Sequence, residues 1–225
     1  MIIITGANRG LGKEISKRLK DNGEEIIALV RSTDDLNIES VKCDISDYNS
    51  IKSASNIIKK KNKPIKAFIN VAGIAAMNMA VTTDELTVKN IIQTNLIGTI
   101  NCCQLFAPLM IRYKTGCFVN FSTIAVALAI KGESVYAASK AGVEVFSRTF
   151  AREMSDFNIR VNCIAPGPIR TDLLKGITDG QIEKIISQQI IPKQFKKSDI
   201  CDLVEFLIDK KSSSLSGQVL NVGGI

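Results

Sequence analysis

Short apolar runs alternate along the chain with longer segments in which apolar residues recur every three or four positions. The runs are rich in β-branched residues, as expected for strands buried on both faces, and lie at 2–4, 25–30, 39–43, 65–71, 117–122, 159–164 and 218–222. The helical patterns lie between them at 10–21, 47–61, 84–111, 134–154 and 199–209. This order predicts a three-layer α/β/α fold with a doubly wound parallel sheet, in a single domain over residues 1–225.

One segment, 172–198, interrupts the alternation. We expect it to form a lid over a substrate, with Gly176 and Gly180 as flexible points. No linker, repeat or low-complexity segment divides the chain.

Composition agrees with one substantial domain, because 45% of the 225 residues are hydrophobic. No apolar stretch approaches the length of about 20 residues that a membrane span needs. Met1 leads directly into the first strand, so we expect no targeting segment. The six cysteines lack C-x-x-C spacing, which predicts reduced, packed thiols in a cytoplasmic protein and no metal site.

The net charge of +7 fits a protein that attracts an anionic cofactor, but a solvated lysine-rich surface explains it at least as well. The run Lys59–Lys63 precedes Pro64 and a strand, and so indicates a helix C-terminus. We therefore expect neither a nucleic-acid nor a membrane partner.

Tyr136 and Lys140 stand four residues apart in an alanine-rich helical segment, which places both on one helix face. A phenol has a reference pKa of about 10, and a nearby cation lowers it toward neutrality. The chain has no histidine, so any proton transfer at this pair must use another group. Alone, the pair also fits an ordinary solvated helix.

A glycine-rich turn follows the first strand and precedes a helix that ends at Gly23, with the spacing Gly6-x-x-x-Gly10-x-Gly12. Glycines allow a tight turn and a close approach of the backbone to phosphate, while the helix N-terminus offers free N–H groups. An ordinary glycine turn remains the alternative for this motif taken alone.

Together these two segments resemble the short-chain dehydrogenase/reductase family, in its compact form. Further segments match in the same order: Asp44-Ile45, the Asn70-Val71-Ala72-Gly73 run, Thr94-Asn95-Leu96, the strand ending in Ser122-Thr123, the loop Pro166–Thr171, and the closing strand 217–224. The resemblance implies a Rossmann-type fold over nearly the whole chain.

The resemblance also implies roles for particular residues. Tyr136 would exchange the proton on the substrate oxygen, Lys140 would lower its pKa and hold the nicotinamide ribose, and Asn95 would anchor a water in the proton relay. The family's substrate-binding Ser stands thirteen residues before the Tyr, which here is Thr123, whereas Ser122 fits only with a shift of one residue. The implied cofactor contacts are Gly6, Asn8, Arg9, Gly10, Leu11, Gly12, Arg31, Asp44, Ile45, Asn70, Ala72, Gly73, Tyr136, Lys140, Pro166, Gly167, Ile169 and Thr171.

Charge indicates which dinucleotide is preferred. Where NAD-selecting family members carry an Asp at the end of the second strand, this chain has Val30, followed by Arg31. Arg31 and Arg9 would converge on the adenosine end, where a guanidinium grips a 2′-phosphate. We therefore expect NADP(H) rather than NAD(H), although two surface arginines would give the same sequence.

The expected activity is interconversion of a carbonyl and a secondary alcohol on a small-molecule substrate. Ile191–Phe195, before Ser198-Asp199-Ile200, resembles the 3-oxoacyl-carrier-protein reductase group. Small apolar residues suggest a modest, partly apolar pocket: Ala125, Ala127, Ala129, Leu173 and Leu174. A sugar substrate stays open, as do two other functions: a nucleotide-sugar epimerase or dehydratase, and a non-catalytic dinucleotide sensor.

The two longest helical patterns, at 84–111 and 134–154, carry more apolar residues than one sheet face can bury. By resemblance they would pair with their copies in a homodimer or homotetramer. The candidate contact residues are Leu105, Phe106, Leu109, Val143, Phe146 and Phe150.

Overall fold

A parallel sheet of seven strands forms the centre of the molecule, in the order β3-β2-β1-β4-β5-β6-β7. The computed structural model describes residues 1–33, 37–174 and 176–225. The strands are β1 (Ile2–Thr5), β2 (Ile26–Val30), β3 (Glu39–Lys42), β4 (Ala67–Asn70), β5 (Cys117–Phe121), β6 (Arg160–Ala165) and β7 (Val219–Asn221). This confirms the predicted fold class.

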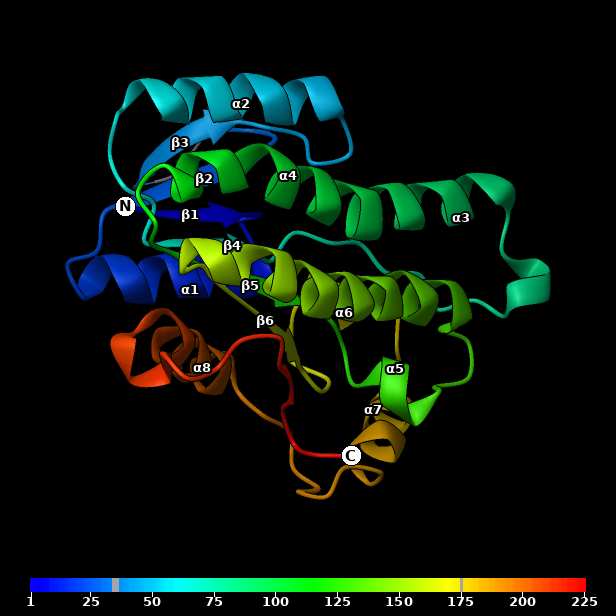
Figure 1. Ribbon diagram of the computed structural model, residues 1–225. Coiled ribbons are helices and arrows are strands. Elements are labelled where there is room, and N and C mark those ends of the chain that lie inside the picture. Colours follow the sequence, from blue (N-terminus) through cyan, green and yellow to red (C-terminus); the bar gives the residue numbers. More distant parts are fainter. Residues whose placement is uncertain (34–36, 175) are drawn as a thin grey trace.

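Helices cover both faces of the sheet (Figure 1), with α2 (Tyr48–Lys60), α4 (Gly98–Ile111) and α6 (Ser134–Met154) on one face and α1 (Gly10–Asp21) and α8 (Lys197–Ile208) on the other. Alternate strand residues serve the two layers: Ile3 packs toward α2, α4 and α6, whereas Ile2 and Ile4 pack toward α1 and α8. Because both faces are covered, the central strands are largely apolar, and so they form nearly continuous apolar runs in the sequence.

Aromatic rings fill the layer beneath α4 and α6. The ring of Phe68 in β4 lies 4.6 Å from that of Phe106, and Phe118 in β5 lies 5.5 Å from Phe150. Phe106, Val143 and Phe150 are buried within this chain, so the prediction that they form a subunit contact is wrong. Leu105, Leu109 and Phe146 are only partly buried and stay candidates.

Helix α3 (Glu85–Ile92) continues through a π-helical turn, Gln93–Ile97, into α4. By length and composition this helix could cross a membrane, contrary to the expectation that no stretch approaches that size. Its contacts with α2, α6 and β4 are those of a core helix of this fold.

Two short helices lie where the sequence suggested loops. Helix α5 (Ala125–Leu128) follows β5, and α7 (Asp179–Ile186) lies within the expected lid. Thr178 caps α7 by accepting a hydrogen bond from the backbone N–H of Gln181. Gly180 therefore belongs to a helix and is not the flexible point we expected, whereas Gly176 has a positive φ of 92° outside any helix.

Candidate active site

A cavity of about 810 Å³ opens at the carboxyl ends of the strands. It lies where the strand order reverses, between β1 and β4, which is the usual ligand position in open α/β sheets. The predicted site residues that line it are Gly6, Asn8, Arg9, Gly10, Leu11, Gly12, Arg31, Asp44, Ile45, Ala72, Gly73, Ser122, Thr123, Tyr136, Lys140, Pro166, Gly167, Ile169 and Thr171. Asn70 and Asn95 do not line it.

The glycine turn between β1 and α1 is closely packed. Gly6 and Gly10 have positive φ angles of 67° and 56°, and a Cβ on Gly12 would lie 2.3 Å from the Gly6 carbonyl oxygen. Arg9, the N-cap residue of α1, makes no side-chain cap hydrogen bond, and the first turn carries no acidic residue. No side chain at the cap thus accepts hydrogen bonds from the first N–H groups of α1. These groups are available to phosphate oxygens, and the turn fits the phosphates of a dinucleotide.

The cavity's second end is formed by the loops after β2 and β3. Val30 is the last residue of β2 and is buried, while Arg31 and Arg9 are both exposed along the lining. The Asp44 carboxylate accepts hydrogen bonds from the backbone N–H and the hydroxyl of Ser46, at 2.9 and 2.7 Å. Two guanidinium groups therefore line the cavity, Arg31 at this end and Arg9 in the glycine turn, and the Asp44 carboxylate is held by its own loop.

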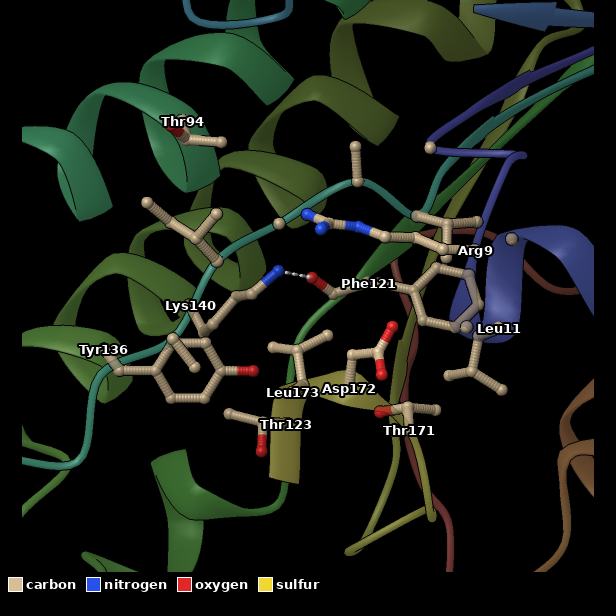
Figure 2. A pocket seen from close by; sticks show the side chains of 18 of the residues that line it. Arg9, Leu11, Thr94, Phe121, Thr123, Tyr136, Lys140, Thr171, Asp172 and Leu173 are labelled. Carbon is tan, nitrogen blue, oxygen red and sulfur yellow. Dashed lines mark hydrogen bonds between the residues drawn. The ribbon is translucent and has the colours of Figure 1, made fainter. Parts of the chain in front are cut away.

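Tyr136 and Lys140 enter the cavity from α6, and Thr123 enters from the end of β5 (Figure 2). The Lys140 side chain is only 4% exposed, and its Nζ donates a hydrogen bond of 2.8 Å to the Phe121 carbonyl oxygen. Burial lowers the pKa of Lys140 from 10.5 to about 8. The ammonium is thus close to titrating near neutral pH.

The phenol of Tyr136 responds to burial in the opposite sense. Desolvation raises its pKa, the neighbouring Glu133 carboxylate raises it further, and the Thr123 side chain acts weakly in the other direction. The expectation that Lys140 lowers this pKa is not met, because its ammonium donates to the Phe121 carbonyl and does not contribute to the shift of the phenol. The phenol is consequently held in its protonated form.

The two candidate hydroxyls lie in different surroundings. Ser122 donates a 2.6 Å hydrogen bond to the Glu144 carboxylate on α6 and is buried. Thr123 is half-buried, interacts with Tyr136, and its Oγ1 accepts a hydrogen bond of 3.2 Å from the Ala125 N–H. The Ser122 hydroxyl is therefore already engaged, while that of Thr123 can still donate.

Asn95 lies behind the cavity wall, in the π-helical turn. Its amide exchanges hydrogen bonds with the backbone of Ile74, at 2.8 and 2.9 Å, and donates to Ser139 Oγ at 3.1 Å. A Cβ on Gly73 would lie 3.1 Å from Asn95 Oδ1 and 3.4 Å from Lys140 Nζ. Asn95 thus reaches the site through the Gly73-Ile74 backbone, and π-turns are frequent at such positions.

Asn70, the other predicted residue outside the lining, is part of the sheet. Its side chain donates a hydrogen bond of 2.8 Å to Asn120 on the paired strand β5. Asn120 in turn donates to Ser147 of α6 at 2.8 Å. This buried chain of polar side chains ties the sheet to the helix that carries Tyr136.

The loop after β6 closes the cavity beside the glycine turn. The two segments are in close contact, because a Cβ on Gly10 would lie only 3.8 Å from the Thr171 side chain. Leu173 and Leu174 line the cavity as expected, and Asp172 lies beside Leu173 (Figure 2). Ala125, Ala127 and Ala129 do not contribute to the lining, because α5 turns this segment away from it.

Several lining residues were not identified from the sequence. They come mainly from the loop after β4, the start of α6 and the segment after β6: Ile74, Ala75, Ala76, Met77, Asn90, Thr94, Ile130, Glu133, Pro168, Asp172, Ile177 and Ile185. The sequence shows only that these residues stand shortly after a buried strand or one helical turn before Tyr136. Such a position does not show whether a side chain points into the cavity.

Fold and site together define an α/β protein built to bind a dinucleotide. The chain belongs to the short-chain dehydrogenase/reductase family, because the family model for short chain dehydrogenases matches residues 1–182. It is thus an oxidoreductase of a family that uses nicotinamide dinucleotides.

Curated relatives match over almost their whole length. The 3-oxoacyl-[acyl-carrier-protein] reductase FabG of Staphylococcus aureus is 28% identical, with 99% of this chain and 96% of the relative covered. The 3-oxoacyl-[acyl-carrier-protein] reductase MabA of Mycobacterium bovis is 29% identical, with 99% and 91% covered.

Solved structures agree with the fold. The aldohexose dehydrogenase of Thermoplasma acidophilum superposes with a TM-score of 0.89 at 27% identity, covering 99% of this chain and 92% of that one. A 4-hydroxyisoleucine dehydrogenase complexed with NADH and succinate gives a TM-score of 0.89 at 26% identity, covering 100% and 98%. These relatives act on different substrates by name, so they do not define one for this chain.

Proposed function

We propose that this protein is an NADP(H)-dependent reductase that interconverts a carbonyl and a secondary alcohol, with Tyr136 as the acid/base. The observation that carries the proposal is the meeting of Tyr136, Lys140 and Thr123 in one cavity with the glycine turn. A dinucleotide-binding sensor would not need a proton-transfer group such as this phenol.

The bound dinucleotide supplies or accepts the hydride. Its phosphates fit the turn Gly6–Gly12, and Arg9 and Arg31 suit a 2′-phosphate on its adenosine. Lys140 would hold the nicotinamide ribose, and Ile169 and Thr171 its carboxamide end. Gly12 allows the turn to be this tight, since a side chain there would collide with the Gly6 carbonyl.

At the substrate, Thr123 donates a hydrogen bond to the carbonyl oxygen and orients it toward the phenol. Tyr136 gives its proton to that oxygen during reduction, and the raised pKa keeps the proton available. Lys140 then stabilises the phenolate that remains, and Asn95 maintains the wall at Gly73-Ile74 and the proton path behind it.

The most specific version of the proposal is a 3-oxoacyl-carrier-protein reductase. It is supported by the names of the relatives that match over almost the full chain. The apolar lining residues Leu173, Leu174 and Ile177 fit an acyl segment.

The test is oxidation of NADPH by the purified protein with a panel of carbonyl compounds, namely simple ketones, diketones, hydroxyketones and a 3-oxoacyl thioester. We expect turnover on at least one of them, and a preference for the thioester would support the narrower assignment. Binding of NADPH without reduction of any member of the panel would contradict the reductase and favour a sensor.

A further inference from the structure

The Glu133 carboxyl lines the cavity and has no role in the proposed mechanism. Glu133 lies at the N-cap position of α6, one helical turn before Tyr136, and it is half-buried along the lining. Its side chain makes no cap hydrogen bond, and its backbone carbonyl accepts from the Ala137 N–H at 2.6 Å. The carboxyl therefore does not serve the helix that it precedes.

No cation is placed to neutralise this carboxyl among the described residues of the lining. Arg9 and Arg31 belong to the adenosine end, and Lys140 donates to the Phe121 carbonyl. Glu133 forms none of the ion pairs found in the described part of the chain, and burial alone raises its pKa. A half-buried carboxylate without an ion-pair partner is free to accept a hydrogen bond from a ligand hydroxyl.

Apolar residues flank Glu133 in its own loop and in the lid. Met77 lies against Gly132, the preceding residue, and Ile130 lies on the same loop. The lid adds Leu173, Ile177 and Ile185 to the lining. Glu133 thus joins Thr123, Tyr136 and Asp172 as a polar group among the apolar residues of the lining, and its carboxylate acts electrostatically on the Tyr136 phenol.

We propose that Glu133 determines substrate specificity by accepting a hydrogen bond from a hydroxyl group on the carbon next to the reacting carbonyl. The inference rests on the proposed reductase function and narrows its substrate to hydroxyketones and the corresponding diols. It replaces the 3-oxoacyl thioester as the most specific substrate, because that thioester has no hydroxyl next to its reacting carbonyl. In the reduction, the carbonyl carbon takes two electrons as hydride from the reduced nicotinamide and the oxygen takes the Tyr136 proton, while the neighbouring hydroxyl stays bound to Glu133.

The geometry also explains why a donor belongs there. An ionised Glu133 opposes the negative charge that develops on Tyr136 when the proton leaves. A hydroxyl that donates to Glu133 disperses the carboxylate charge and reduces that opposition. A substrate lacking the donor leaves the carboxylate unpaired beside the reacting atoms.

The test compares 3-hydroxy-2-butanone with 3-methoxy-2-butanone, which keeps the oxygen but has no donor. For the wild type we expect kcat/KM to be about tenfold to hundredfold higher for the hydroxyketone, the range of a hydrogen bond to a charged group. Glu133→Ala should bring the ratio close to one, and Glu133→Gln should keep part of it, because its amide oxygen still accepts. Glu153→Gln, an exposed position on the same helix, is the matched control and should keep the wild-type ratio.

A binding measurement gives a readout independent of turnover. Titration of the NADPH-loaded protein with 2,3-butanediol and with 2-butanol should show tighter binding of the diol, and Glu133→Ala should remove the difference. An unchanged ratio in Glu133→Ala, or equal binding of the two alcohols by the wild type, overturns the role of Glu133 while the reductase stands. Failure to reduce any carbonyl overturns the reductase itself and this inference with it.

Discussion

At the scale of single residues, the site depends on two groups whose pKa values are moved in opposite directions by burial. Tyr136 is held as the neutral phenol, whereas the pKa of Lys140 is lowered to about 8, so its ammonium is still mostly charged at neutral pH. The pairing of Tyr136 and Lys140 was visible in the sequence, because four-residue spacing defines one helix face. The sequence did not indicate that Glu133 lines the cavity, because the direction of its side chain depends on how the preceding loop packs on Met77.

The two candidate hydroxyls can be separated by substitution. Thr123→Ala should lower kcat for carbonyl reduction by about tenfold or more, since it removes a donor to the substrate oxygen. Ser122→Ala should have the smaller effect on kcat, because its hydroxyl serves Glu144, and it should instead reduce thermal stability. Steady-state kinetics and thermal melts of both variants measure this, and a larger kcat loss in Ser122→Ala would reverse the assignment.

At the scale of elements, the strands and long helices were predictable and the short ones were not. Strands buried on both faces give continuous apolar runs, and α1, α2, α6 and α8 begin and end within two residues of the predicted bounds. Helix α5 is a single turn, and α7 was concealed by Gly180 inside it. The π-helical turn leaves no mark on the periodicity, so the position of Asn95 behind the wall needed the structure.

The carboxyl end of β2 should decide which dinucleotide is preferred. Val30→Asp together with Arg31→Ala should shift the preference from NADPH toward NADH, because the new carboxylate repels a 2′-phosphate and accepts hydrogen bonds from a free ribose diol. Dissociation constants of both dinucleotides, measured for the variant and the wild type, test this. Tighter binding of NADH than NADPH by the wild type would show that the two arginines do not select the cofactor.

At the scale of the whole molecule, all six cysteines are buried free thiols, as the sequence predicted. Burial raises their pKa from 9.0, to about 11 for Cys43, Cys117 and Cys201 and to about 12 for Cys103 and Cys163. The lowered pKa of Lys140 makes the free energy of unfolding rise between about pH 8 and 10.5, which opposes the effect of the cysteines. It is a single group, whereas several cysteines are shifted.

Stability should therefore fall in alkaline solution. Above pH 9 the unfolded chain loses thiol protons that the folded chain keeps, so it binds fewer protons and the free energy of unfolding decreases as pH rises toward 11–12. Urea unfolding at several pH values under reducing conditions measures the slope, and Cys117→Ala should make it shallower. A free energy of unfolding that is constant or rises between pH 9 and 10.5 would refute the assignment.

We also predict that the protein self-associates through the outer faces of α4 and α6. Leu105, Leu109 and Phe146 are only partly buried there, and Val145 is exposed. Light scattering at micromolar concentration should give at least twice the chain mass of 24.5 kDa, and Val145→Glu should reduce it. A wild-type monomer would exclude this surface as a subunit contact.

The most direct measurement of the proposed chemistry is the turnover of Tyr136→Phe on a confirmed carbonyl substrate. The substitution keeps the ring and its packing but removes the proton that Tyr136 transfers to the substrate oxygen. We predict that the variant folds, binds NADPH like the wild type and loses about 10²–10⁴-fold in kcat. Retention of more than about a tenth of the wild-type kcat would contradict the account, because the proton would then have to come from another group.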